Sequence, residues 1–171
     1  MQQSNVRSID VNRRNLLAGL LSLTAAGSVL AFARPSVSAE KDPNLAAVDS
    51  RNITGVEALA RAKRGEVTIV DVRSPQEWKQ TGVPAGARSV TIHGPEGIEG
   101  FVRAMTRSVN GRLDTPVALI CARGNRSTRA LNALQAAGFT QVLNIKEGML
   151  GGASGSGWLA QDLPLDPCIS C

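Results

Sequence analysis

Residues 116–127 read PVALICARGNRS, and this stretch decides how the chain folds and where its chemistry lies. The first half, Pro116–Cys121, is an apolar run of strand length. The second half passes through Gly124 into Ser127–Ala137, an alanine- and leucine-rich segment that predicts a helix ending at Gly138. A cysteine therefore stands where a predicted strand gives way to a loop and a helix.

The rest of the body alternates the same two kinds of element. Thr54 and Glu57 have the spacing of a capping box, which predicts the start of a short helix. Apolar residues recur at helical spacing from Ile98 to Val109. Further strands are predicted at Val67–Val72, Ser89–Ile92 and Val142–Ile145. This alternation predicts an α/β fold with a mainly parallel central sheet and helices on both faces.

The first 39 residues differ in composition from the rest of the 171-residue chain. Paired arginines, Arg13 and Arg14, precede the apolar stretch Leu16–Phe32 and the small residues Val37–Ala39. This order resembles a twin-arginine signal peptide, so we expect the export machinery to read it and the protein to be exported to the periplasm with residues 1–39 removed. The alternative is a retained membrane anchor facing the periplasm, although about 17 apolar residues are few for a span.

The predicted organisation is a signal peptide (1–39), a linker (40–52), one domain (53–164) and a tail (165–171). Without residues 1–39 the formal charge falls from +5 to +2, because 15 basic residues then face 13 acidic ones. The body contains no basic block with interleaved aromatic residues, which excludes nucleic acid as the expected partner. For one small domain we expect a monomer.

The loop after Cys121 predicts an anion-binding environment for its sulfur. Main-chain N–H groups of the loop, the start of the following helix and two arginines would favour a thiolate over a thiol. Gly124 would allow the required backbone turn. We expect the loop to be open and positively charged. The alternative from the residues alone is an inert, buried cysteine at a strand end.

The motif Cys121-x-x-Gly124-x-Arg126-Ser127 resembles the active-site loop of rhodanese domains. The resemblance spans about Ile53–Pro164. Its supporting matches, in the family's order, are Asp71-Val72-Arg73 with Glu77-Trp78, then Gly82–Ala87, then Glu147–Gly152 with Trp158.

The resemblance implies a rhodanese-like fold and a sulfurtransferase that needs no cofactor. Cys121 would take sulfane sulfur from a small anionic donor such as thiosulfate, become a persulfide, and pass the sulfur to a thiol or protein acceptor. The loop cradle would comprise Ala122, Arg123, Gly124, Asn125, Arg126 and Ser127. Arg123 would attract the donor, and Arg126 would steady the loop or the substrate. Asp71 and Arg73 would hold the loop region together.

Two rival functions stay open. Cysteine phosphatases and arsenate reductases use a Cys-x5-Arg loop, whereas Arg126 gives Cys-x4-Arg here, with less room for a tetrahedral oxyanion. A non-catalytic rhodanese-type binding module would usually have lost the cysteine or the loop arginines. The single histidine, His93, has no evident partner in the sequence and is interpreted as an incidental loop residue.

The chain ends in a second pair of cysteines, Cys168 and Cys171. Such a pair predicts a structural disulfide or, as the alternative, a redox relay that resolves or receives the persulfide sulfur. The glycines and serines of residues 151–157 predict a flexible segment that would let the tail fold back. Two thiolates are half of a tetrahedral zinc site, so no metal is expected.

Overall fold

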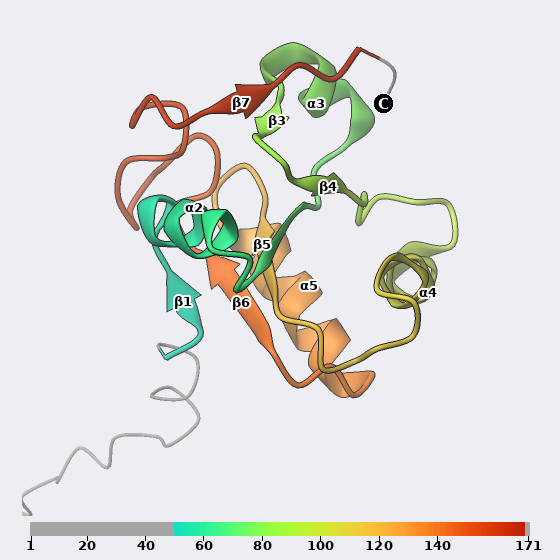
Figure 1. The fold of residues 1–171 in the computed structure, drawn as a ribbon. Coiled ribbons are helices and arrows are strands. Elements are labelled where there is room, and N and C mark those ends of the chain that lie inside the picture. Colours follow the sequence, from blue (N-terminus) through green and yellow to red (C-terminus); the bar gives the residue numbers. More distant parts are fainter. Residues whose placement is uncertain (1–49, 170–171) are drawn as a thin grey trace, which may run out of the picture. The chain divides into compact units, whose positions relative to one another are not determined.

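The computed structural model describes residues 50–169 of the chain, and five parallel strands form its central sheet. The spatial order is β1 (Asn52–Ile53), β6 (Val142–Ile145), β5 (Val117–Ile120), β2 (Thr68–Asp71) and β4 (Arg88–Ser89), as Figure 1 shows. All four residues of β5, the middle strand, are buried. A parallel strand needs cover on both faces, which explains why this strand reads as a continuous apolar run.

Helices cover both faces of the sheet, which confirms the predicted α/β architecture. α4 (Gly97–Ser108) and α5 (Asn125–Ala136) pack on one face, where Phe101 and Leu134 share a core with Leu119 of β5. α2 (Gly55–Lys63) packs on the other face, where Ala58 shares a core with Ala118. Neighbouring residues of β5 therefore point to opposite cores, as the two-residue period of a strand requires.

Two predicted boundaries differ slightly from the observed ones. α2 is capped as expected, since the Glu57 N–H donates to Thr54 Oγ1 at 3.1 Å, but the Glu57 carboxylate pairs with Arg61 instead of closing the capping box. The strand predicted at Ser89–Ile92 is only the two-residue β4. The chain after β4 nevertheless continues to pair with the end of β2 and the residue after it, because the Ile92 N–H donates to the Val72 carbonyl.

One helix was not predicted from the sequence. α3 (Pro75–Thr81) begins at Ser74, whose hydroxyl accepts from the Glu77 N–H, while the Glu77 carboxylate accepts from the Ser74 N–H at 3.0 Å. Pro75 occupies the first helical position, where its missing N–H costs nothing. Only Trp78 of this helix is buried, so seven residues carried no helical periodicity to recognise.

A small second sheet brings the predicted tail into the domain. β7 (Leu165–Asp166) pairs antiparallel with β3 (Val83–Pro84). A Cβ at Gly82 would lie 2.8 Å from the Asp166 carbonyl oxygen, so the close approach of β7 requires glycine there. The predicted boundary after Pro164 therefore falls just before a strand, and Asn52 of the predicted linker already belongs to β1.

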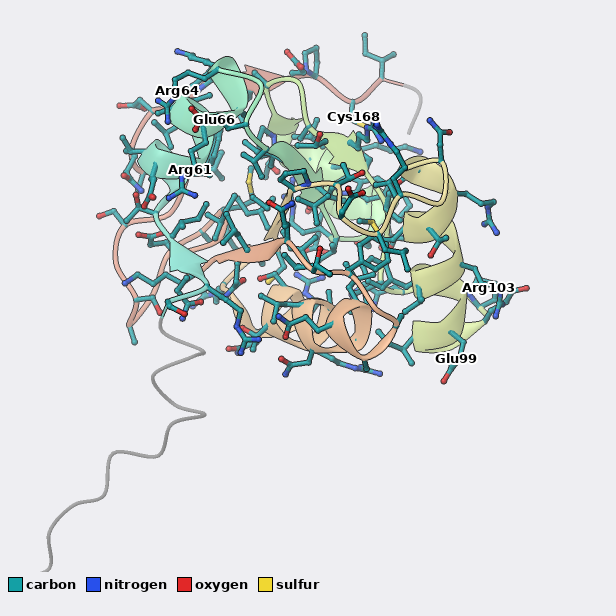
Figure 2. All side chains as sticks on the ribbon, turned by 60° about the horizontal axis from the view of Figure 1, so that its bottom comes forward. Arg61, Arg64, Glu66, Glu99, Arg103 and Cys168 are labelled. Carbon is teal, nitrogen blue, oxygen red and sulfur yellow. The ribbon has the colours of Figure 1, made fainter. Side chains whose placement is uncertain are left out.

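The predicted signal peptide, residues 1–39, lies outside the described residues, and its removal and export stay predictions. Among residues 50–169, no helix is both long enough and apolar enough to cross a bilayer. Ionised side chains occupy separate parts of this surface: Figure 2 shows Arg64 with Glu66 near α2, and Arg103 at the other side on α4.

Candidate active site

Cys121 directly follows β5, and the segment after β6 holds its backbone. The Met149 N–H donates to the Cys121 carbonyl at 2.8 Å, and the Leu150 N–H donates to the Ala122 carbonyl at 2.9 Å. A Cβ at Gly148 would lie 2.6 Å from both carbonyl oxygens. A glycine at residue 148 therefore lets the two segments approach, and these bonds fix the position of the cysteine.

Gly124 supplies the turn that starts α5. It has φ +86°, and a Cβ at this position would lie 2.3 Å from the Lys146 carbonyl oxygen. Glycine is therefore required here for two reasons: its backbone is left-handed, and the neighbouring chain leaves no room for a Cβ. α5 begins at Asn125, two residues earlier than predicted, so the first helical turn belongs to the loop itself.

The loop after Cys121 leaves main-chain donors without a backbone partner. Within residues 50–169, no backbone carbonyl accepts a hydrogen bond from the N–H groups of residues 122–127. The Ser127 hydroxyl lies 3.4 Å from Cys121 Sγ and 2.9 Å from the Gly124 carbonyl oxygen. Because a hydroxyl has one proton, the shorter contact takes most of the donation. The sulfur therefore lies beside the Ser127 hydroxyl, and the loop that follows it contains main-chain donors without a backbone partner.

The Cys121 side chain is more enclosed than the expected open loop. Only 1% of the residue is exposed, and it belongs to the core that also contains Val72 and Ile92. Arg123 and Asn125, by contrast, are exposed. Arg123 forms no ion pair with any residue of the described range, so its positive charge faces solvent uncompensated.

Arg126 is held between two other segments. Its Nη1 and Nη2 donate to the two carboxylate oxygens of Glu77 at 2.7 and 2.6 Å, and Nη1 also lies 3.0 Å from His93 Nε2. The sequence alone predicts a fixed positive charge at Arg126 and an incidental loop residue at His93. Glu77 instead neutralises the guanidinium, and His93 has a definite neighbour. Both partners lie far from Arg126 in sequence, so no local pattern reveals them.

The Arg126–Glu77 pair shifts both titrations. The hydrogen bond from Arg126 lowers the pKa of Glu77 from 4.5 to about 2, with a further contribution from the Ser74 N–H and hydroxyl, while burial opposes the shift. The same bond raises the pKa of Arg126, and the nearby Cys121 adds a smaller contribution in the same direction. The pair is therefore ionised at neutral pH, and it ties α3 to the loop.

Asp71 and Arg73 form a buried ion pair whose further hydrogen bonds go to the end of α3. Arg73 Nε and Nη2 donate to Asp71 Oδ2 at 2.9 and 2.7 Å. Arg73 also donates to the Thr81 hydroxyl at 2.7 Å and the Gly82 carbonyl at 2.6 Å. The pair thus anchors the end of α3, which in turn presents Glu77 to Arg126.

The segment before the tail is tightly packed, which corrects the expected flexible linker. Cβ atoms at Gly151 and Gly157 would lie 2.5 and 2.2 Å from the backbone nitrogen of the other glycine. Gly152 and Gly155 exchange two backbone hydrogen bonds. Trp158 is buried, and its indole N–H donates to the Pro164 carbonyl at 3.0 Å. These glycines therefore allow close backbone contact.

The cysteines differ in state. Cys121 is a free thiol, whereas Cys168 is disulfide-bonded. Cys171 lies outside the described residues, so the relay stays a prediction. Among residues 50–169, no three His, Cys, Asp or Glu side chains gather in the manner of a metal site.

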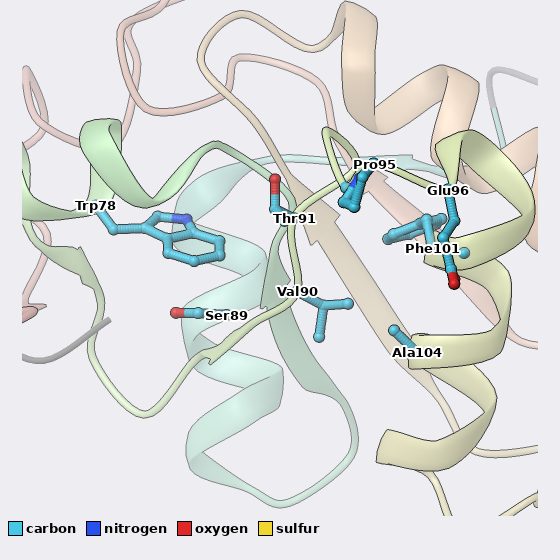
Figure 3. Close-up of a pocket in the computed structure, with 10 residues that line it drawn as sticks. Trp78, Ser89, Val90, Thr91, Pro95, Glu96, Phe101 and Ala104 are labelled. Atoms are coloured by element: carbon cyan, nitrogen blue, oxygen red, sulfur yellow. The ribbon is translucent and has the colours of Figure 1, made fainter.

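A pocket of about 500 Å³ lies behind the loop that carries His93. Figure 3 shows Trp78 at one end and Phe101 with Ala104 of α4 at the other, with Thr91 and Pro95 of the loop between them. The lining does not include Cys121. The pocket is thus separate from the sulfur, yet it shares the 89–96 loop with the site.

Three comparisons place the chain among known proteins. An uncharacterised protein of Rickettsia prowazekii, RP600, is 31% identical over 98 residues, covering 56% of this chain and 80% of its own. A polysulfide-sulfur transferase homodimer from Wolinella succinogenes is structurally similar, with a TM-score of 0.52 at 20% identity over 73% of this chain and 88% of its own.

A protein of unknown function from Rhodopseudomonas palustris, described as a possible tyrosine phosphatase, has a TM-score of 0.51 at 24% identity over 71% of this chain and 89% of its own. At these identities the two structures show the fold alone. The profile of the rhodanese-like domain matches residues 54–154 and therefore contains the β2 strand, α3, the Cys121 loop and its support. The chain belongs to the family of rhodanese-like domains.

Proposed function

We propose that this protein is a sulfurtransferase that carries sulfane sulfur on Cys121. The observation that supports this most directly is the loop after Cys121: the N–H groups of residues 122–127 donate to no backbone carbonyl of the described range, and the Ser127 hydroxyl lies 3.4 Å from Sγ. Free N–H donors of such a loop, where they face the sulfur, stabilise its anion, whether thiolate or persulfide. Members of this family are generally sulfurtransferases; thiosulfate as the donor is the finer proposal.

The proposed reaction has two displacement steps. The Cys121 thiolate attacks the outer sulfur of thiosulfate, the sulfur–sulfur bond of the donor breaks, and sulfite leaves with the bonding electrons. An acceptor thiolate then attacks the outer sulfur of the Cys121 persulfide. The bond to Sγ breaks, Cys121 returns as a thiolate, and the acceptor leaves as a persulfide. Each step moves one sulfur atom and needs neither metal nor cofactor.

Arg123 is the residue that we propose attracts the anionic donor. It is exposed beside the loop and has no ion-pair partner within the described range. Arg126, whose charge is balanced by Glu77, is assigned the other expected role, that of steadying the loop.

Arg123→Gln should therefore raise KM for thiosulfate about three- to tenfold and change kcat little. The same substitution at Arg129, which is also exposed, is the control and should leave both constants unchanged.

The bond between Arg126 and Glu77 also weakens the phosphatase alternative. A phosphate held over Cys121 would need the planar fork of an arginine, but both ends of this fork already bind the Glu77 carboxylate.

A turnover assay tests the alternative of a non-catalytic binding module. With thiosulfate and a thiol or cyanide acceptor, wild type should form sulfite continuously and Cys121→Ala should not. Equal rates from both proteins would contradict the proposal.

We further propose that the protein acts in the periplasm after export through its twin-arginine segment. Replacing Arg13 and Arg14 by lysine should retain the chain in the cytoplasm of a bacterial host, measured by cell fractionation. An unchanged distribution would contradict this route. Sodium carbonate extraction of the wild-type membrane fraction separates the released protein from the anchored alternative.

A further inference from the structure

We infer that His93 is a positioning residue that fixes Arg126, and through it the sulfur-binding loop. This inference rests on the proposed function for its kinetic consequence, while its structural content stands apart from it. The contact that carries it is Arg126 Nη1 to His93 Nε2 at 3.0 Å. His93 lies between β4 and α4, 33 residues before Arg126.

The chemistry of the two side chains decides the direction of this bond. A guanidinium has five N–H donors and no acceptor, so Arg126 must donate and His93 Nε2 must accept. The inference therefore requires an imidazole that carries its proton on Nδ1 and leaves Nε2 free to accept. The two hydrogens of Nη1 are then both used, one toward Glu77 Oε2 at 2.7 Å and one toward His93. Arg126 thus connects three segments: α3, the 89–96 loop and the start of α5.

The 89–96 loop is held at Ile92 by the core and by the bond to the Val72 carbonyl, but it borders a pocket at Gly94 and Pro95. Behind it lies the pocket of about 500 Å³ lined by Thr91, Pro95 and Phe101 (Figure 3), so packed side chains do not fill that side. His93 itself is exposed. Locally, its N–H donates to the Thr91 hydroxyl at 3.1 Å, which sets the main chain. The bond to Arg126 adds a polar side-chain contact to the apolar packing of Ile92, which shares a core with Cys121.

Two substitutions at residue 93 distinguish the loss of the hydrogen-bond acceptor from a general effect of replacing the imidazole. His93→Leu removes the acceptor, and His93→Gln keeps one in its side-chain oxygen. We expect kcat for sulfur transfer to fall about fivefold to tenfold in the leucine variant, with KM for the donor nearly unchanged, because His93 presets the loop without touching the donor. The glutamine variant should keep at least half of the wild-type kcat. Equal kcat in wild type and His93→Leu, or equal losses in both variants, would overturn the inference.

A spectroscopic measurement tests the same bond without any turnover. His93 is the only histidine, so ¹⁵N NMR of the untagged protein gives one set of imidazole signals. We expect the Nδ1–H tautomer at neutral pH, which is the less populated one in free neutral histidine. A dominant Nε2–H form would overturn the inference even if the enzyme is active. If the expected tautomer appears but wild type transfers no sulfur, the bond stands and the proposed function fails.

Discussion

At the scale of single residues, the loop depends on the Glu77 carboxylate, which lies 49 residues before Arg126 in the sequence. Glu77 has its pKa lowered to about 2, so its ion pair with Arg126 stabilises the fold fully above pH 4.5 and is lost as the pH falls from 4.5 toward 2. Between pH 5 and pH 3, the free energy of unfolding should fall by about 1 kcal/mol more in wild type than in Glu77→Gln. The difference is small because the pair is partly exposed, and thermal unfolding followed by circular dichroism measures it. An equal loss in both proteins would contradict the assigned pair.

Gly124 gives the second prediction at this scale. Gly124→Ala should destabilise the protein by about 3 kcal/mol and abolish sulfur transfer, because the new Cβ would lie 2.3 Å from the Lys146 carbonyl oxygen. Gly86→Ala is the matched control: it has a similar positive φ of 73° but open space around the new atom. Urea unfolding should show a loss of only about 1 kcal/mol there. Equal losses would mean that backbone strain, and not the clash, makes glycine necessary.

At the scale of elements, α3 links the buried Asp71–Arg73 pair to the sulfur loop. Ser74→Ala removes the cap of α3 and should cost about 1 kcal/mol in stability while lowering kcat, because Glu77 is on this helix. Thr54→Ala removes the similar cap of α2 and should cost as much stability without lowering kcat. The two variants are compared by urea unfolding and by turnover. A loss of activity in both would show a general effect of helix fraying.

The elements also show how far local sequence patterns reach. The apolar run before Cys121 predicted a strand of the sheet, and the spacing from Ile98 to Val109 predicted a covering helix. Both predictions succeeded because the apolar residues of these two segments are the ones buried in the core. α3 was missed because one buried residue, Trp78, makes no pattern, although Ser74, Pro75 and Glu77 form a recognisable helix start. Arg126 and its partners, 49 and 33 residues away, meet only through the tertiary fold.

At the scale of the whole molecule, the end of the chain belongs to the domain more closely than its composition indicated. The Asp166 carboxylate accepts from the Gly86 N–H at 2.7 Å, in addition to the β3–β7 pairing. A chain ending at Pro164 should therefore be about 1–2 kcal/mol less stable than one ending at Asp166, by urea unfolding. Both lack Cys168, so the difference isolates β7. Equal stability would mean that β7 contributes nothing measurable.

Composition alone does not distinguish a flexible segment from a tightly packed one at residues 151–157. The glycines of residues 151–157 suit a flexible linker as well as a turn with touching backbones, and only the approach of Gly151 to Gly157 separates the two. Likewise, Cys121 at a strand end suits an inert thiol or a nucleophile. Only the fold shows that the N–H groups of residues 122–127 donate to no backbone carbonyl of the described range.

The most direct test of the account is the mass of the intact protein after incubation with thiosulfate and removal of the excess. Wild type should gain the mass of one sulfur atom, with peptide mapping placing it on Cys121, and Cys121→Ser should gain nothing. An unchanged wild-type mass, or sulfur found on the serine variant, would contradict a persulfide held at the end of β5.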